Sequence, residues 1–299
     1  VVVGSRFSDR VTGNTANYAK NATIIQIDID EAEINKNVSV DMSIIGDVKA
    51  VLERMNERME QMYHKEWMDK VMARKDALPM TYSEEGLTCP YVMEKLDELT
   101  DSDKTIICTE VGQHQMWAAQ YYHYTHPRTL ITSGGLGTMG YGLGASLGAQ
   151  VGCPDKRVIN IAGDGCFRMN MNELATASRY NIPIIEVIIN NQVLGMVRQW
   201  QKLFYGKRYS MTDLRAGAAT RRGEEHPPKY TPDFVKLAES YGAKGIRVTE
   251  KSEMKAAFEQ AKANRALKVP TLIEFMLDPE VQVYPMVRPG GTLEDLLMD

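Results

Sequence analysis

Two short polar segments each follow an apolar run, and their residue types could bind a metal-bound diphosphate. Gly163-Asp164-Gly165-Cys166 follows the β-branched run 157–162, and Asn190-Asn191 follows the apolar run 182–189. Such runs are typical of buried parallel strands, and the segment between them has apolar residues at helical spacing over 170–180. This order predicts a strand–loop–helix–strand crossover with Asp164 and Asn191 at the carboxyl ends of neighbouring strands, where open α/β sheets bind ligands.

The chemistry of these residues suits a hard cation and a phosphate. Asp164 offers a carboxylate and Asn191 an amide oxygen, the ligand types that Mg²⁺ prefers when it shares its shell with substrate phosphates. Gly165 lets the backbone approach a phosphate closely, and the N–H groups of Gly165 and Cys166 can donate to it. A Gly-Asp-Gly triplet alone is usually a plain turn, and Asp164 could instead cap a helix. The Asn-Asn pair that follows favours the metal–diphosphate interpretation.

Gly-Asp-Gly followed at this spacing by Asn-Asn is the thiamine-diphosphate signature. Three other segments, 111–120, 132–142 and 194–201, have the sequences VGQHQMWAAQ, TSGGLGTMGYG and LGMVRQWQ. With them, nearly the whole chain resembles the carboxyl-terminal half of the catalytic subunit in the acetohydroxyacid synthase (acetolactate synthase) family. One segment departs from the family pattern, because the stretch from Arg215 to Pro228 resembles an insertion into a loop that is usually shorter.

The resemblance implies a role for particular residues of this pocket. Gln113 and His114 would donate to the cofactor diphosphate, the Gly137 carbonyl would accept from its 4′-amino group, and Met139 would keep it bent. A lone histidine or methionine is more often structural, so these roles depend on the family match. The implied metal ligands are Asp164, Asn191 and the Val193 carbonyl. The implied cofactor contacts are Val111, Gly112, Gln113, His114, Gly137, Met139, Gly163, Asp164, Gly165, Cys166, Asn191, Val193, Leu194 and Met196.

Two further sets follow from the resemblance. Met196 and Trp200, with Val197 between them, would line the substrate channel. Together with Gly137 and Met139, Met196 and Trp200 are the candidate catalytic residues that the resemblance implies. Near the start of the chain, the family would use a set of residues to bind flavin adenine dinucleotide (FAD) in a largely structural role, although their charges alone suggest only a solvated loop. That set is Arg6, Asp9, Arg10, Asp28, Ile29, Glu33, Asp47 and Val48.

The implied activity is decarboxylation of pyruvate and ligation of its acyl carbon to a second 2-ketoacid, pyruvate or 2-ketobutyrate, in branched-chain amino acid biosynthesis. The family works as homodimers or larger homo-oligomers, in some cases with a regulatory small subunit. Its pyrimidine-binding domain carries a glutamate that reaches the cofactor from the other subunit. That domain is not in this chain, so we expect the chain to be inactive alone.

Alternatives remain open on the sequence. A related thiamine-diphosphate decarboxylase or oxidase of 2-ketoacids would keep Asp164 and Asn191 but lack the Gln113-His114 block and the helix from Met196 to Trp200. A non-catalytic cofactor-binding fragment is a further alternative. A flavin or nicotinamide oxidoreductase is disfavoured, because no Gly-x-Gly-x-x-Gly follows a strand and opens a helix.

Composition limits the remaining function classes. The chain has 35 basic and 39 acidic residues, a net charge of −4, so it carries no basic footprint for nucleic acid or for a membrane surface. Its four cysteines are scattered without metal-ligand spacing, which indicates reduced thiols and a cytoplasmic setting. The stretch 129–154 has no charged residue but contains eight glycines, which favours a ligand loop and a closely packed helix over a membrane span.

The order of predicted elements gives the domain organisation. Strands at 1–3 and 23–29 predict the end of an FAD-type α/β domain over 1–48, and a helical pattern over 47–67 begins a connection that extends over 49–86. Over 87–278, alternating helices and β-branched strands predict a doubly wound, mostly parallel sheet that binds thiamine diphosphate and Mg²⁺. The tail 279–299 is expected to be extended.

Overall fold

The computed structural model describes residues 1–215 and 231–298, which form two compact units. The smaller unit comprises Val1–Thr81 and Tyr284–Asp299, and the larger comprises Tyr82–Val283. Of the insertion expected between Arg215 and Pro228, only Arg215 lies within the described residues.

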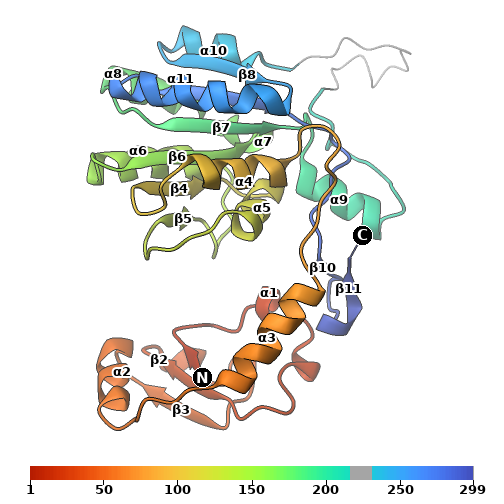
Figure 1. Ribbon diagram of the computed structural model, residues 1–299. Helices are drawn as coiled ribbons and strands as arrows, with labels where there is room; N and C mark the ends of the chain where they lie inside the picture. Colours follow the sequence, from red (N-terminus) through yellow and green to blue (C-terminus); the bar gives the residue numbers. More distant parts are fainter. Residues whose placement is uncertain (216–230, 299) are drawn as a thin grey trace. The chain divides into compact units, whose positions relative to one another are not determined.

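The larger unit is built on one sheet of six parallel strands in the order β5-β4-β6-β7-β9-β8 (Figure 1). The central strands are runs of apolar, largely β-branched residues that are buried on both faces, as parallel strands require. The strands are β4 Thr105–Thr109, β5 Leu130–Thr132, β6 Arg157–Gly163, β7 Ile185–Asn190, β8 Lys244–Val248 and β9 Thr271–Met276.

Helices cover both faces of this sheet. Helices α4 (Cys89–Leu99), α5 (Gln113–Tyr121) and α11 (Met254–Ala266) share one hydrophobic core with alternate strand residues. Helices α6 (Tyr141–Gly152), α8 (Leu174–Arg179) and α10 (Phe234–Ser240) share a second core with the other strand residues. The predicted doubly wound parallel sheet is therefore confirmed.

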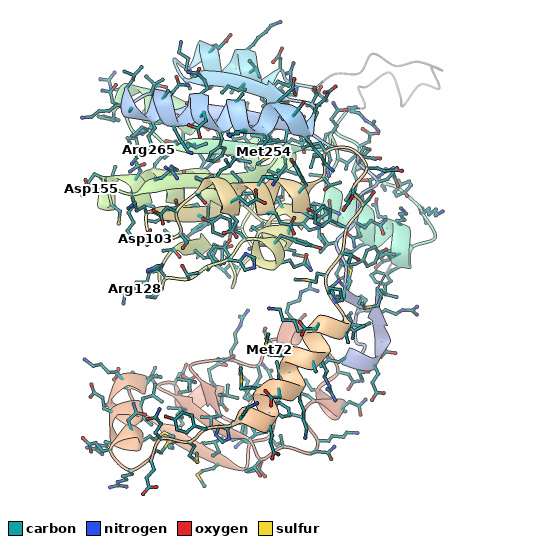
Figure 2. All side chains as sticks on the ribbon, in the orientation of Figure 1. Met72, Asp103, Arg128, Asp155, Met254 and Arg265 are labelled. Carbon is teal, nitrogen blue, oxygen red and sulfur yellow. The ribbon has the colours of Figure 1, made fainter. Side chains whose placement is uncertain are left out.

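The edge of the sheet where its strands begin differs from the opposite edge, where they end. Asp103, Arg128 and Asp155 lie where β4, β5 and β6 begin, close to the end of α11 that carries Arg265 (Figure 2). The Arg265 guanidinium donates to the Lys156 carbonyl at 2.7 Å and so ties this edge together. At the opposite edge, β6 and β7 lead directly into short helix α7 (Asp164–Phe167) and the loop before α9 (Gly195–Phe204). All the strands point toward that second edge.

The smaller unit contains a parallel sheet of three strands, β1 Val2–Val3, β2 Ile25–Asp28 and β3 Met42–Ile45. Its α-helices are α1 (Asp9–Thr12), α2 (Val48–Asn56) and α3 (Lys65–Ala77). Near the carboxyl end of the chain, β10 Met286–Val287 pairs antiparallel with β11 Leu296–Leu297. The extended tail therefore closes into a short two-stranded ladder.

The expected elements were wrong or incomplete at several points. The range 47–67 holds α2 and only the start of α3, because α2 ends just after Met55, its last partly buried side chain, and residues 57–64 are exposed. Strands β3 and β8 and helix α5 were not predicted. Strand β8 escaped notice because it is an edge strand whose charged residues interrupt the apolar pattern. Within the described ranges, no helix has the length and apolar character needed to cross a bilayer.

Candidate functional site

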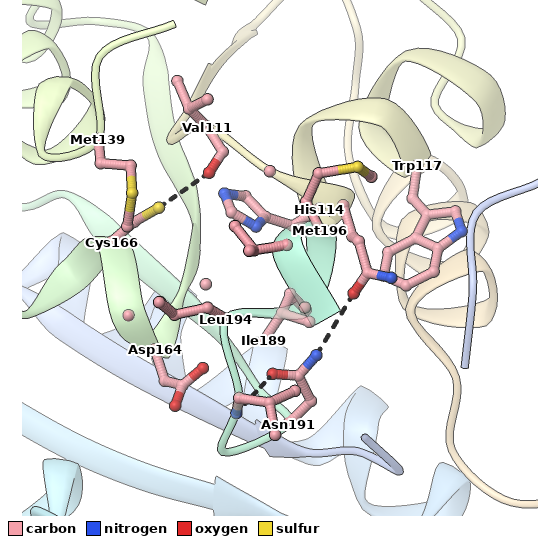
Figure 3. A pocket seen from close by; sticks show the side chains of 17 residues that line it. Val111, His114, Trp117, Met139, Asp164, Cys166, Ile189, Asn191, Leu194 and Met196 are labelled. Carbon is pink, nitrogen blue, oxygen red and sulfur yellow. Dashed lines mark hydrogen bonds between the residues drawn. The ribbon is translucent and has the colours of Figure 1, made fainter. Parts of the chain in front are cut away.

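The loops that follow β4, β6 and β7 meet in one pocket at the carboxyl edge of the larger sheet (Figure 3). The pocket is lined by residues 111–114, 163–166 and 193–197 with Trp117, Met139, Ile189 and Asn191. The structure therefore brings together most of the predicted cofactor-contact residues. Gly137 and Trp200 do not line it, and Trp200 instead packs its ring edge-on against Phe204.

Asp164 is the first residue of α7, and its side chain is only 1% exposed. Burial raises the pKa of its carboxyl to about 7, although the Arg168 guanidinium, 4.0 Å away, opposes the shift. Among the described residues, its Oδ2 has no hydrogen-bond partner. A buried carboxylate oxygen without a partner costs free energy, and a cation at this position would satisfy it.

Asn190 and Asn191 have different surroundings although they are adjacent. Asn190 Nδ2 donates to Glu274 Oε1 at 2.6 Å and so joins the end of β7 to β9. Asn191 lines the pocket; its Oδ1 accepts from the Val193 N–H at 3.2 Å and its Nδ2 donates to Gln113 Oε1 at 3.4 Å. The predicted metal ligands Asp164, Asn191 and Val193 thus line one pocket, and their role as ligands remains a prediction.

A second segment holds the loop after β7 in place. The Leu194 N–H donates to the Thr212 carbonyl at 2.8 Å, and the Leu214 N–H donates to the Gln192 carbonyl at 3.0 Å. Val193 therefore forms an antiparallel bridge with Asp213. This pairing fixes the main chain of Val193, whose carbonyl is a predicted metal ligand.

His114 lies in the first turn of α5 with its ring buried at 5% exposure. Burial lowers the pKa of the ring to about 3, and a hydrogen bond to the Glu110 main chain opposes that shift. Its Nε2 is buried and has no partner within the described part of the chain. A phosphate beside Nε2 would favour the protonated ring, which donates from both nitrogens.

Glycines leave room for the ring and the loops of the pocket. A Cβ atom on Gly163 would lie 3.0 Å from the His114 ring, and one on Gly165 would lie 2.7 Å from Leu194 Cδ2. Cys166 completes the contact between two loops, because its thiol donates to the Val111 carbonyl at 2.9 Å (Figure 3). Burial raises the pKa of that thiol to about 12, so it stays neutral. At Gly163, Gly165 and Cys166 the pocket wall is main chain and one small side chain, which suits close approach of a phosphate.

Glu110 was not predicted, although it shapes one wall of the site. It is fully buried directly after β4, and its carboxylate accepts from the N–H groups of Gly140 (2.7 Å), Gly142 (2.8 Å) and Leu143 (3.3 Å). Burial raises the pKa of this carboxyl, and the three backbone donors oppose the shift. Glu110 therefore anchors the start of α6 and the turn that carries Met139. In the sequence, Glu110 could have been recognised as an acidic residue placed directly after an apolar strand.

The predicted FAD residues lie at the carboxyl ends of the strands in the smaller unit. Arg6, Asp9 and Glu33 line a hollow there together with Lys36 and Asn37. Asp28 and Ile29 come at the end of β2, and Asp47 and Val48 open α2 beside them, since the Gly46 N–H donates to the Asp28 carbonyl at 2.9 Å. Arg10 does not line the hollow. Their contact with a flavin remains a prediction.

The pocket of the larger unit fits a cation whose shell is completed by a phosphate. In the part of the chain that the structure describes, no group of three or more His, Cys, Asp or Glu side chains could hold a metal ion by itself. Asp164, Asn191 and the Val193 carbonyl would supply only part of an octahedral shell, which is the usual arrangement for Mg²⁺ shared with phosphates. Asp164 Oδ2 and His114 Nε2, which lack a hydrogen-bond partner in this part of the chain, would find one in a metal-bound diphosphate.

Comparison with known proteins gives two family matches. Residues 110–275 match the thiamine pyrophosphate enzyme, C-terminal TPP binding domain, and residues 1–55 match the thiamine pyrophosphate enzyme, central domain. The chain is 45% identical to the acetolactate synthase large subunit of Corynebacterium glutamicum, over 99% of this chain and 46% of that protein. It is 38% identical to the acetolactate synthase isozyme 3 large subunit of Escherichia coli, over 98% of this chain and 50% of that protein. The chain spans about half the length of these relatives.

Proposed function

Because the chain belongs to the thiamine pyrophosphate enzyme family, we propose that the pocket of its larger unit binds thiamine diphosphate through Mg²⁺ in an acetolactate synthase. The observation that carries this proposal is a pair of buried pocket atoms, Asp164 Oδ2 and His114 Nε2, that have no hydrogen-bond partner among the described residues. An anionic oxygen and an imidazole nitrogen suit the two parts of a metal diphosphate, the cation and a phosphate oxygen.

The residues of the chain would divide the work of binding. Asp164, the Asn191 side-chain oxygen and the Val193 carbonyl would hold the cation. His114 and the N–H groups of Gly165 and Cys166 would donate to the phosphates. When bound, thiamine diphosphate supplies the electron sink that stabilises the acyl carbon of a 2-ketoacid after CO₂ leaves, so that this carbon can add to a second 2-ketoacid.

Other residues would shape the space around the reacting groups. Met139 is 36% exposed and lies against Gly165, where it can support a bent cofactor. The carbonyl of Gly137 would accept from the cofactor's amino group, and Gly137 adopts a left-handed φ of 65° that suits glycine. Met196 and Trp200, on α9, would bound the acceptor ketoacid. The side-chain N–H groups of Gln113 already donate to Gln199 Oε1 and the Val281 carbonyl, so Gln113 would support the pocket wall without donating from its side chain to the cofactor.

The remaining expectations belong to the same proposal. The hollow at Arg6, Asp9 and Glu33 would hold part of an FAD whose role is structural. The boundaries 1–48, 49–86, 87–278 and 279–299 would separate the end of the FAD-type domain, a connection, the thiamine-diphosphate domain and a tail. The active protein would be a cytoplasmic homodimer or larger homo-oligomer that acts on pyruvate and 2-ketobutyrate and can bind a regulatory small subunit.

The test is acetolactate formation from pyruvate with thiamine diphosphate, Mg²⁺ and FAD, measured on this chain and on the full product of its gene. We expect acetolactate from the full product and none from the chain alone, because a glutamate of a separate domain would complete the site. The Asp164→Ala variant of the full product serves as the control and should be inactive. Acetaldehyde or acetate without acetolactate would instead indicate a decarboxylase or an oxidase.

A further inference from the structure

A row of buried side-chain amides begins at Gln199, on the inner face of α9. Gln199 is 2% exposed and exchanges two hydrogen bonds with the main chain of Val283. Its Nε2 donates to the Val283 carbonyl at 2.8 Å, and its Oε1 accepts from the Val283 N–H at 3.0 Å. The backbone of residue 283 therefore fixes which side of the Gln199 amide carries oxygen, because a main-chain N–H only donates and a carbonyl only accepts.

The row continues through Gln113 to the pocket. Gln113 Nε2 donates to Gln199 Oε1 at 2.8 Å and to the Val281 carbonyl at 3.2 Å, which leaves Gln113 Oε1 to accept from Asn191 Nδ2 at 3.4 Å. At the far end, Asn191 Oδ1 accepts from the Val193 N–H at 3.2 Å. Figure 3 shows the two bonds of Asn191.

The direction of every bond in this row is set by main-chain groups at both ends. Turning over the amide of Gln113 would place its NH₂ against that of Asn191 and its oxygen against two acceptors. Turning over the amide of Asn191 would place its NH₂ against the Val193 N–H. Each reversal would leave buried polar groups without partners, at a cost of about 1–3 kcal/mol per group. Asn191 is therefore held with its oxygen on the side of Val193, and one lone pair of that oxygen remains.

We propose that Gln199 is a positioning residue for the metal site: by accepting from Gln113, it holds the Asn191 amide in the orientation that offers oxygen to the cation. This inference rests on the proposed function. Gln199 does not line the pocket, so it acts on Asn191 through Gln113. The alternative is that Gln199 merely pins residues 281–283 to α9, which would stabilise the unit without affecting the metal.

The experiment measures binding of Mn²⁺ to the full gene product at saturating thiamine diphosphate, using the electron paramagnetic resonance of free Mn²⁺. Residues that orient a metal ligand typically change metal affinity 10–100-fold when replaced, so we expect Gln199→Met to weaken Mn²⁺ binding at least tenfold. The matched control is Gln150→Met. Gln150 is 4% exposed and donates to three main-chain carbonyls at the opposite edge of the sheet, so its loss should leave Mn²⁺ affinity unchanged.

Two more variants separate positioning from folding. Gln199→Glu keeps an acceptor for Gln113 and, as the protonated acid, a donor to the Val283 carbonyl, so it should keep Mn²⁺ affinity within about threefold of wild type, well below the loss expected when an orienting group is missing. Gln199→Asn keeps a buried amide but is one methylene shorter; it should weaken binding as Gln199→Met does, and it replaces that variant if Gln199→Met does not fold. In turnover assays, the weakened variant should need more Mg²⁺ for half-maximal activity, with near wild-type rate at saturating Mg²⁺.

The outcomes distinguish this inference from the proposed function. If wild type binds Mn²⁺ with thiamine diphosphate and a folded Gln199→Met or Gln199→Asn variant binds it equally well, the inference fails alone. Failure of Gln199→Glu to restore affinity would also overturn it, as would an equal loss of affinity in Gln150→Met. If wild type shows no Mn²⁺ binding that depends on thiamine diphosphate, both the inference and the proposed function fail.

Discussion

Gly195 provides the sharpest steric prediction from this structure. A Cβ atom at this first residue of α9 would lie 2.1 Å from Gln113 Oε1 and 2.8 Å from Asn191 Nδ2. These distances are far below van der Waals contact, and both atoms belong to buried, hydrogen-bonded amides that could move away only by disturbing their hydrogen bonds. The backbone of Gly195 is not left-handed, so an alanine here would suffer only the steric clash.

We therefore expect Gly195→Ala to destabilise the larger unit and to disturb its pocket together. Overpacking of a buried site costs about 1–3 kcal/mol, and for a unit of this size each kcal/mol lowers the melting temperature by about 2–4 °C. The expected fall is thus roughly 2–12 °C for the transition of the larger unit in the full gene product. Displacement of the Asn191 amide should also weaken Mn²⁺ binding with thiamine diphosphate at least about tenfold.

The matched control is Gly144→Ala, also in a helix. A Cβ atom at Gly144 would have nothing within 4 Å, so alanine there should stabilise α6 by about 0.5–1 kcal/mol and leave metal binding unchanged. Both variants would be followed by thermal unfolding and by Mn²⁺ titration. A Gly195→Ala protein as stable as wild type, with wild-type metal affinity, would refute this account of the packing around Gln113 and Asn191.

Three further predictions concern buried ionisable groups. Because burial lowers the pKa of His114 to about 3, the unfolded chain protonates this ring at a higher pH than the folded protein does, so stability falls as the pH drops below 6.5. Between pH 7 and pH 4, the free energy of unfolding measured with urea should fall by about 3 kcal/mol less in His114→Gln than in wild type. Because burial raises the pKa of Asp164 to about 7, the metal-free protein loses stability as the pH rises from about 4 to 7. At pH 8, urea unfolding should therefore give Asp164→Asn a free energy of unfolding about 1–4 kcal/mol above that of wild type, although the variant loses metal-dependent cofactor binding. Equal stability of the two proteins would contradict this prediction. Glu110→Ala would leave the N–H groups of Gly140, Gly142 and Leu143 without their acceptor, and calorimetry should show a loss of about 2–4 kcal/mol, whereas Glu239→Ala, at an exposed position of α10, should show little change.

The sequence predicted the part of the site that depends on local pattern. The β-branched runs before Gly163 and Asn190 identified β6 and β7, and the length between them required a parallel crossover. Those two facts place Asp164 and Asn191 at one edge before any coordinates are known. The family resemblance, carried by the segments 111–120, 132–142 and 194–201, was confirmed by the comparisons.

The rest of the site depends on contacts between distant residues. Gln113 meets Gln199 across 86 positions, and Gln199 meets Val283 across 84, so no local pattern links them. Glu110 finds its partners 30–33 positions later, at the start of α6. A glutamine on an amphipathic helix or an acid after a strand is ordinarily exposed, and only tertiary packing made these two buried.

The central claim is that this pocket binds thiamine diphosphate through a divalent cation. The most direct measurement is calorimetric titration of thiamine diphosphate into the full gene product, with Mg²⁺ and again with excess chelator, for wild type and Asp164→Ala. We expect wild type to bind thiamine diphosphate only when Mg²⁺ is present, and Asp164→Ala not to bind it. Equal binding without Mg²⁺, or binding that survives the loss of Asp164, would contradict this claim.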